Sequence, residues 1–174
     1  MTQTSSAQKV TAYIGLGSNL EHPLTHIEQA AEALNRIPHT RLLALSPLYQ
    51  SKAIGPGEQS DYINAAAALE TSLSPLKLLH QLQIIENQQG RKRGPVRWVA
   101  RTLDLDLLLF DNIILETEEL TIPHPRMTER NFVLFPLRDL AKLLSPSLAL
   151  PDGRSIADLA QSCNDADISP TNGK

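Results

Sequence analysis

The strongest chemical signal in the sequence is a pair of aspartates that alternates with leucines. Asp104 and Asp106 lie in the run TLDLDLL at residues 102–108. Successive side chains of a strand point to opposite faces, so the two carboxylates would share one face with their Cα atoms about 6.5 Å apart. Two carboxylates that close repel each other unless a cation or a proton lies between them. The pair therefore indicates a Mg²⁺ site, because Mg²⁺ takes one or two carboxylates together with substrate phosphates.

The same pattern has a plainer interpretation, a solvated strand face on which acids happen to alternate. Aspartate is depleted in strands, and this strand continues into the apolar run LLLF at residues 107–110, which predicts burial on both faces. A buried central strand is a poor place for two acids without a role. The metal site is therefore the favoured interpretation.

A cluster of basic residues precedes this strand. Five cations and one tryptophan, with no acid among them, fall within eleven residues: Arg91, Lys92, Arg93, Arg97, Trp98 and Arg101. In a chain of net charge −3 they create a local positive field that suits phosphates. Taken alone, such a cluster more often marks a solvated charged loop. Because Arg101 stands just before Asp104, cations and metal-binding acids would meet at one strand end, as Mg²⁺-dependent polyphosphate chemistry requires.

Several familiar chemistries find no support in the sequence. The run GLG at residues 15–17 lacks the third glycine of a dinucleotide motif, and no P-loop run occurs, so a P-loop would not hold ATP. Cys163 is the only cysteine, which excludes an intrachain disulfide and zinc-ligand spacing. No serine or cysteine stands in an arrangement that indicates nucleophilic catalysis.

Composition limits the class of protein further. The 174 residues, 41 % hydrophobic and 20 % charged, are typical of one folded domain with a sizeable core. The acidic balance argues against a globally basic nucleic-acid binder. No apolar run approaches the roughly 18 residues that span a bilayer, and the first nine residues lack a secretory core, so we expect a cytoplasmic protein without membrane contact.

Periodicity places the candidate residues on interleaved strands and helices. Two-residue alternation and short apolar runs predict strands, whereas apolar residues at helical spacing predict helices. Ser74-Pro75 is typical of a helix start and Gly90 of a helix end. We expect strands at residues 10–16, 42–48, 62–69 and 102–110, a loop at 50–60, and helices at 24–37, 74–90, 126–144 and after Ser155.

Three further expectations concern the second half of the chain. The turn Asp111-Asn112 predicts that residues 113–115 pair back on the preceding strand. Pro136 should kink or split the helix at 126–144. Residues 164–174 show no periodicity and are expected to form a loose tail. The elements interleave without a regular βα repeat, which predicts an α+β fold with helices on a mixed or antiparallel sheet.

Four blocks of the sequence resemble one enzyme family. The run RWVARTLDLDLL at residues 97–108 resembles the signature segment of the 6-hydroxymethyl-7,8-dihydropterin pyrophosphokinases. The other blocks are YIGLGSNL at 13–20, Gly55-Pro56 followed by DYINA at 61–65, and PHPRM at 123–127 followed by RNFVL at 130–134. They run in family order from about residue 12 to residue 140.

The resemblance implies a reaction and a fold. The reaction is transfer of pyrophosphate from ATP to the hydroxymethyl group of the pterin, with release of AMP, in folate biosynthesis. The fold is a ferredoxin-like α/β/α sandwich with helices on both sides of a mostly antiparallel sheet. We expect a single pyrophosphokinase domain at residues 1–163, a flexible tail at 164–174, a monomer, and no nucleic-acid partner.

The resemblance also assigns roles to individual positions. Asp104, Asp106, Arg91 and Arg101 would be catalytic, and the two aspartates would hold two Mg²⁺ ions between ATP and the pterin hydroxyl. The ATP-binding positions are Gln83, Glu86, Arg93, Arg101, Leu107, Leu120, Thr121, His124 and Arg130. The pterin-binding positions are Ser51, Ile54, Tyr62, Asn64, Trp98 and Phe132. Tyr62 and Phe132 would stack on the two faces of the ring, and Trp98 would close the basic loop over the site.

The residue types alone leave plainer interpretations open. His124 is as typical of a structural loop histidine as of a phosphate ligand. Tyr62 and Phe132 are simply interpreted as core residues, and Gln83 and Glu86 as a solvated helix face. Val99-Ala100 stand where the family usually has Gly-Pro, which restricts the backbone before Arg101.

Two other functions fit parts of the pattern. A ferredoxin-like RNA-binding module would use the basic loop and the sheet, but it requires solvent-facing aromatics where this chain has aspartates. A different Mg²⁺-dependent nucleotidyl- or glycosyltransferase would use the same acid pair. Tyr62, Asn64 and Phe132 favour a flat heteroaromatic acceptor over that alternative.

Overall fold

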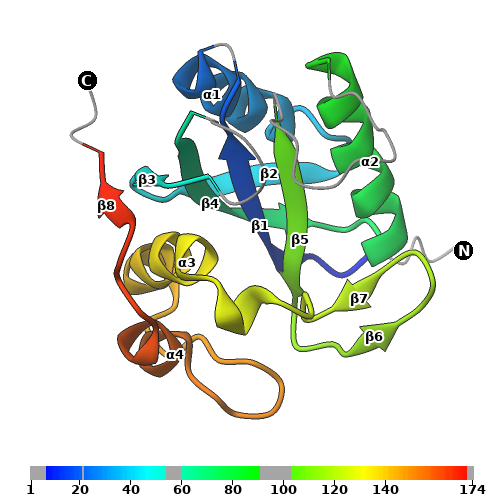
Figure 1. Cartoon of the computed structure of the whole chain (residues 1–174). Coiled ribbons are helices and arrows are strands. Elements are labelled where there is room, and N and C mark those ends of the chain that lie inside the picture. Colours follow the sequence, from blue (N-terminus) through cyan, green and yellow to red (C-terminus); the bar gives the residue numbers. More distant parts are fainter. Residues whose placement is uncertain (1–6, 21, 54–59, 91–102, 172–174) are drawn as a thin grey trace, which may run out of the picture.

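The computed structural model describes residues 7–20, 22–53, 60–90 and 103–171, which form a sheet with helices on both faces (Figure 1). The strands are β1 (Val10–Ser18), β2 (Thr40–Leu45), β3 (Tyr49–Ser51), β4 (Tyr62–Thr71), β5 (Asp104–Phe110), β6 (Leu115–Glu116), β7 (Thr121–Ile122) and β8 (Ile168–Pro170). The helices are α1 (Pro23–Leu34), α2 (Pro75–Gln88), the 3₁₀ turn η1 (Met127–Glu129), α3 (Asn131–Leu144) and α4 (Ile156–Ser162).

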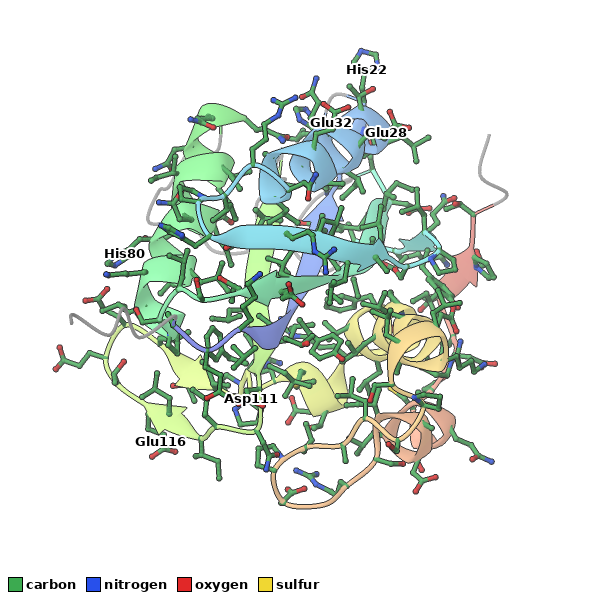
Figure 2. The ribbon with its side chains drawn as sticks, turned by 180° about the vertical axis from the view of Figure 1, so that it is seen from behind. His22, Glu28, Glu32, His80, Asp111 and Glu116 are labelled. Carbon is green, nitrogen blue, oxygen red and sulfur yellow. The ribbon has the colours of Figure 1, made fainter. Side chains whose placement is uncertain are left out.

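The main sheet has the order β5-β1-β4-β3-β8, with β2 also paired to β4, and every pairing in it is antiparallel. One face packs on α1 and α2, and the other on α3 and α4 (Figure 1). The exposed residues of these helices point away from the sheet, as Figure 2 shows for Glu28 and Glu32 of α1 and His80 of α2. The expected sandwich with helices on both sides is confirmed.

Strand β1 explains how one strand serves both faces. Ala12, Ile14 and Leu16 alternate and are buried against α1 and α2. Tyr13 is buried in the opposite core beneath α3. By the same alternation Gly15 and Gly17 face the α3 side, where they add no side chain to the sheet surface.

A β-bulge changes the register of β5 near its centre. Tyr13 pairs with Leu109 whereas Ile14 pairs with Leu107, so Leu108 is the extra residue. Leu107 packs toward α1 and α2, and both Leu108 and Leu109 pack toward α3. The carbonyl of Leu108 accepts a hydrogen bond from the His124 amide at 2.9 Å. Through this hydrogen bond, the bulged residue of β5 holds the loop that follows β7.

The predicted helix ends are confirmed where a side chain or glycine makes the cap. The Ser74 hydroxyl accepts from the Lys77 amide at the start of α2, and Gly90 ends that helix with φ 83°. The Ser155 hydroxyl accepts from the Asp158 amide at the start of α4. Each bond satisfies an amide that the first helical turn cannot pair.

Several expected boundaries are wrong. The strand expected at 42–48 ends as β2 at Leu45, and β3 occupies the start of the expected loop. Residues 113–115 do not pair back on β5; instead β6 pairs with β7. Helix α3 continues through Pro136, and the interruption falls at Arg130, whose extended backbone separates η1 from α3.

The expectation of a loose tail is wrong for part of residues 164–174. Ile168–Pro170 form β8, which pairs antiparallel with β3 at the edge of the sheet. In the part of the chain that the structure describes, the helices are all too short or too polar to cross a membrane.

Candidate functional site

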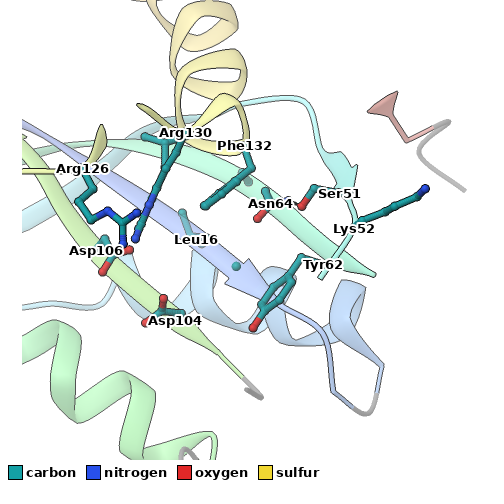
Figure 3. Close-up of a pocket in the computed structure, with 14 residues that line it drawn as sticks. Leu16, Ser51, Lys52, Tyr62, Asn64, Asp104, Asp106, Arg126, Arg130 and Phe132 are labelled. Atoms are coloured by element: carbon teal, nitrogen blue, oxygen red, sulfur yellow. Dashed lines mark hydrogen bonds between the residues drawn. The ribbon is translucent and has the colours of Figure 1, made fainter. Parts of the chain in front are cut away.

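A pocket of about 350 Å³ lies between the sheet and the start of α3. It opens on the α3 side of β5, β1 and β4 (Figure 3). Its lining residues are Gly15, Leu16, Gly17, Ser51, Lys52, Tyr62, Asn64, Ala65, Asp104, Asp106, Arg126, Arg130, Phe132 and Val133. Seven of the predicted site residues are therefore brought together in one cavity: Ser51, Tyr62, Asn64, Asp104, Asp106, Arg130 and Phe132.

The floor of the pocket exists because β1 presents glycine there. Gly17 pairs with Asp104 on β5 and with Asn64 on β4, so the acid and the amide flank a position without a side chain. A Cβ at this position would lie 3.5 Å from Asn64 Oδ1 and 3.7 Å from a Tyr62 ring carbon. The strand predicted from the sequence ends at residue 16, so the sequence does not predict this role of Gly17.

Asp104 and Asp106 confirm the predicted alternation. Both side chains are half-buried and line the pocket, while Leu105 and Leu107 between and beyond them are buried in the opposite core. Figure 3 shows Arg126 and Arg130 extending toward Asp106 from the loop before α3 and from its start. Two hard oxygen ligands on a rigid strand, facing a pocket with cations opposite, fit Mg²⁺ bound together with a polyphosphate.

His124 is positioned next to this charged end of the pocket. Its amide is bound to Leu108 of β5, and its ring Nδ1 accepts from the Arg126 amide at 3.3 Å, which leaves Nε2 to carry the proton. Burial lowers the pKa of His124 below its ordinary 6.5, and the charges of Arg130 and Arg126 lower it further, against the opposing effect of Asp104. The imidazole is therefore neutral at pH 7.

The lowered pKa of His124 predicts a pH-dependent stability. As the pH falls below 6.5 the unfolded chain takes up a proton at His124 while the folded protein resists it, so the free energy of unfolding decreases. Replacing His124 by glutamine should reduce this loss as the pH falls below about 6.5. Urea denaturation across this range measures it, with His80→Gln, an exposed histidine of α2, as the matched control. Identical pH profiles for wild type and His124→Gln would contradict the assignment.

The other end of the pocket is a slot between two aromatic rings. Tyr62 and Phe132 are half-buried and lie on opposite sides of the cavity, with Asn64 between them on the floor (Figure 3). Asn64 is 3 % exposed, and its amide nitrogen donates to the Ser51 hydroxyl at 2.7 Å, which fixes its orientation. The Arg130 guanidinium lies 5.6 Å from the centre of the Phe132 ring. A flat heteroaromatic ring with polar edges fits such a slot.

Six of the predicted ATP-side residues that the structure describes do not line this pocket, and one of them is His124, which lies beside it. Leu107 and Leu120 are buried in the core beneath α1 and α2, and Thr121 lies on β7. Gln83 is half-buried on α2, and Glu86 is buried there. Ile54, Arg91, Arg93, Trp98 and Arg101 lie outside the described residues. Lys52 and Arg126 line the pocket without having been predicted, although Arg126 belongs to the block PHPRM that carried part of the resemblance.

Glu86 has a structural task in this arrangement. It is 2 % exposed, and its carboxylate accepts from the Leu105 amide on β5 at 3.0 Å. Replacing Glu86 by alanine should lower the free energy of unfolding by about 1–3 kcal/mol, because a buried amide loses its partner. Urea denaturation measures the loss, and Asn87→Ala, an exposed change on the next residue of α2, should cost far less. Equal stability of the two variants would show that the bond to Leu105 contributes nothing.

An acid pair opposed by arginines beside an aromatic slot suits phosphoryl transfer to a flat acceptor. The sequence model of the family described as 7,8-dihydro-6-hydroxymethylpterin-pyrophosphokinase (HPPK) matches residues 13–142. The chain belongs to this family of folate biosynthesis, whose members are ATP-dependent pyrophosphokinases.

Individual relatives agree with the family match. The chain is 50 % identical over 151 residues to the 2-amino-4-hydroxy-6-hydroxymethyldihydropteridine pyrophosphokinase of Pseudomonas aeruginosa, covering 87 % of this chain and 90 % of the relative. It is 49 % identical to the enzyme of the same name from Haemophilus influenzae, with 87 % and 92 % covered.

A solved structure supports the fold. The HPPK-DHPS of Plasmodium falciparum with pterin and p-hydroxybenzoate superposes with a TM-score of 0.66 at 16 % identity. The match covers 91 % of this chain, which spans 44 % of the length of that protein. At this identity the likeness concerns the ferredoxin-like architecture alone.

Proposed function

We propose that this protein transfers the terminal pyrophosphoryl group of ATP to the hydroxymethyl group of 6-hydroxymethyl-7,8-dihydropterin and releases AMP. The proposal depends on one observation: the carboxylates of Asp104 and Asp106 and the aromatic slot lie in the same pocket. A polyphosphate held at the acid pair and a pterin held in the slot would bring the reacting oxygen and phosphorus together.

The slot would orient the acceptor. Tyr62 and Phe132 would stack on the two faces of the pterin ring, and Asn64 would bond its amide edge from the floor. The bond from Asn64 to Ser51 fixes the Asn64 amide before the acceptor arrives, so little rotamer entropy is lost on binding. The hydroxymethyl group would then point along the floor toward Asp104. Asp104 and Asn64 lie on either side of Gly17, because Gly17 pairs with both of them.

The acid pair would prepare the phosphate for attack. Asp104 and Asp106 would hold two Mg²⁺ ions, which when bound neutralise the polyphosphate and lower the pKa of the acceptor hydroxyl. The hydroxymethyl oxygen forms a bond to the β-phosphorus, the bond from that phosphorus to the α,β-bridging oxygen breaks, and AMP leaves. The hydroxyl proton would pass to Asp104, whose half-buried carboxylate borders the acceptor slot.

The cations opposite the acid pair would hold the polyphosphate. Arg130 and Arg126 line the pocket, and Nε2–H of His124 is available to donate to a phosphate oxygen. We propose Arg91, Arg93 and Arg101 as further phosphate ligands and Trp98 as a closing group, from the resemblance alone. Gln83 and Thr121, both partly exposed, are proposed on the ATP side, which the buried Leu107, Leu120 and Glu86 would shape from beneath.

A nucleotide-product assay tests the proposal. Purified protein is incubated with ATP, Mg²⁺ and 6-hydroxymethyl-7,8-dihydropterin, and AMP is separated from ADP. Pterin-dependent AMP is the expected product, and its absence without added Mg²⁺ is the matching control. Formation of ADP would mean an ordinary kinase reaction, and nucleotide hydrolysis without pterin dependence would overturn the acceptor assignment.

A further inference from the structure

The two walls of the acceptor slot come from segments that are far apart in the sequence. One wall is formed by β4, which carries Tyr62, and by β3, whose Ser51 pairs with Tyr62. The other wall is the start of α3, which carries Phe132. Residues 164–171 leave α4, pass beside α3 and continue as β8 along β3 (Figure 1). This C-terminal segment therefore touches elements of both walls.

The C-terminal segment is attached first to the α3 wall. The Asn131 side-chain amide donates to the Asn164 carbonyl at 2.8 Å and to the Ala166 carbonyl at 3.3 Å. Asn131 stands between Arg130 and Phe132, which both line the pocket. The Asn164 side chain accepts in turn from the Ala166 amide at 2.8 Å, which closes the turn that Asn131 holds.

Its second attachment is to the β3 wall. Ser51 pairs with Ile168, and the Lys52 amide donates to the Asp167 carbonyl at 3.1 Å. The side chains of Lys52 and Asp167 also form an ion pair at 3.2 Å, but both are mostly exposed, so it adds little stability. The pairing of β8 with β3 is therefore the main attachment of the segment to this wall. It includes Ser51, whose hydroxyl accepts the hydrogen bond from Asn64.

We infer that the C-terminal segment 164–171 is a positioning element that fixes the width of the acceptor slot. It does so by bonding to Asn131 on one wall and to β3 on the other. The inference rests on the proposed function, since it concerns affinity for the pterin. Because β8 and β5 are at opposite ends of the sheet order, the attachment to β3 should leave polyphosphate binding at Asp104 and Asp106 unchanged.

Two variants test the two attachments. Asn131→Ala removes both bonds to the segment, and Ser169→Pro interrupts the pairing of β8 with β3, because proline lacks the amide that a paired strand requires. The controls are Asn35→Ala, which removes one bond that the Asn35 side-chain oxygen accepts from the Leu42 amide on β2, and Ser169→Ala, which keeps the backbone pairing.

The readout is the dissociation constant of the pterin, measured by calorimetry in the presence of a non-hydrolysable ATP analogue. We expect it to rise about fivefold in Asn131→Ala and Ser169→Pro. The dissociation constant of the analogue should stay within about twofold of wild type in Ser169→Pro and should rise less than that of the pterin in Asn131→Ala, because Asn131 adjoins Arg130. Both controls should behave as wild type. Unchanged pterin affinity in either variant would overturn the inference. Equal weakening of both ligands, or unfolding of a variant, would also overturn it, since the segment would then support the whole fold.

The same titration separates this inference from the proposed function. A wild-type protein that binds the pterin but forms no AMP would overturn the proposed reaction while the variants still report on the slot. A wild-type protein that forms AMP, with variants of unchanged pterin affinity, would overturn the positioning role alone.

Discussion

Replacing Asp106 by alanine is expected to lower kcat for pterin-dependent AMP formation about a thousandfold, which corresponds to about 4 kcal/mol of transition-state stabilisation. The reason is that one carboxylate alone cannot hold the charge-neutralising ions against the polyphosphate. The fold should be retained, because Asp106 is half-buried on the pocket face and belongs to neither apolar core. Steady-state measurement of AMP formation at saturating ATP and pterin gives kcat, and thermal unfolding checks the fold.

Asp111→Asn is the matched control for this prediction. Asp111 follows β5 directly, is exposed, and has φ 51°, a conformation that asparagine tolerates well. It loses the same charge from the same part of the chain, so its kcat should equal that of wild type. A kcat for Asp106→Ala close to the wild-type value would rule out the role of the acid pair in the reaction.

Replacing Gly17 by valine is expected to weaken pterin binding about a hundredfold, because branched carbons would fill the floor of the slot between Asn64 and Tyr62. Affinity for a non-hydrolysable ATP analogue should change far less, since the acid pair and Arg130 are untouched. Stability should be kept, because valine favours strands and φ at this position lies in the region open to all residues. Calorimetric titration of each ligand measures the two effects.

Gly17→Ala supplies the graded comparison. Its Cβ would meet Asn64 Oδ1 at 3.5 Å, an ordinary van der Waals contact, so pterin affinity should fall only a few-fold. A valine variant that binds pterin as tightly as wild type would show that the acceptor lies elsewhere than on this floor.

Local chemistry made much of the site predictable. The alternation of Asp104 and Asp106 with leucines required one polar face on a buried strand, and the structure has that arrangement. Ser74 and Ser155 identified helix starts because a hydroxyl before a helix accepts a free amide. The roles of the individual site residues came from the resemblance, and they remain predictions to be tested by substitution.

The features that could not be predicted depend on contacts distant in the sequence. Helix α3 tolerates Pro136 within a buried face, and the chain breaks at Arg130 instead. The bulge at Leu108 follows from pairing with β1 and leaves no local signal. Strand β8 is three residues long without alternation, so only its partner β3 makes it a strand.

The floor of the slot illustrates the same limit. Gly17 faces the pocket because β1 is paired on both sides, with β4 and with β5, and neither pairing is visible in the glycine itself. A glycine before a helix is ordinarily interpreted as a turn residue. Gly17 leaves space between Asp104 and Asn64 only because β1 is in register with both β5 and β4.

The outer strands of the sheet each have a local feature that removes a free backbone amide from the strand edge. On β5 the carboxylate of Glu86 accepts from the outward amide of Leu105, and on β2 the side-chain oxygen of Asn35 accepts from the Leu42 amide at 2.9 Å. Strand β8 is short and ends at Pro170, which has no amide hydrogen to offer. Open strand edges recruit strands from neighbouring molecules, and side-chain caps and proline remove that template. These features of the strand edges thus discourage edge-to-edge aggregation between copies of the protein.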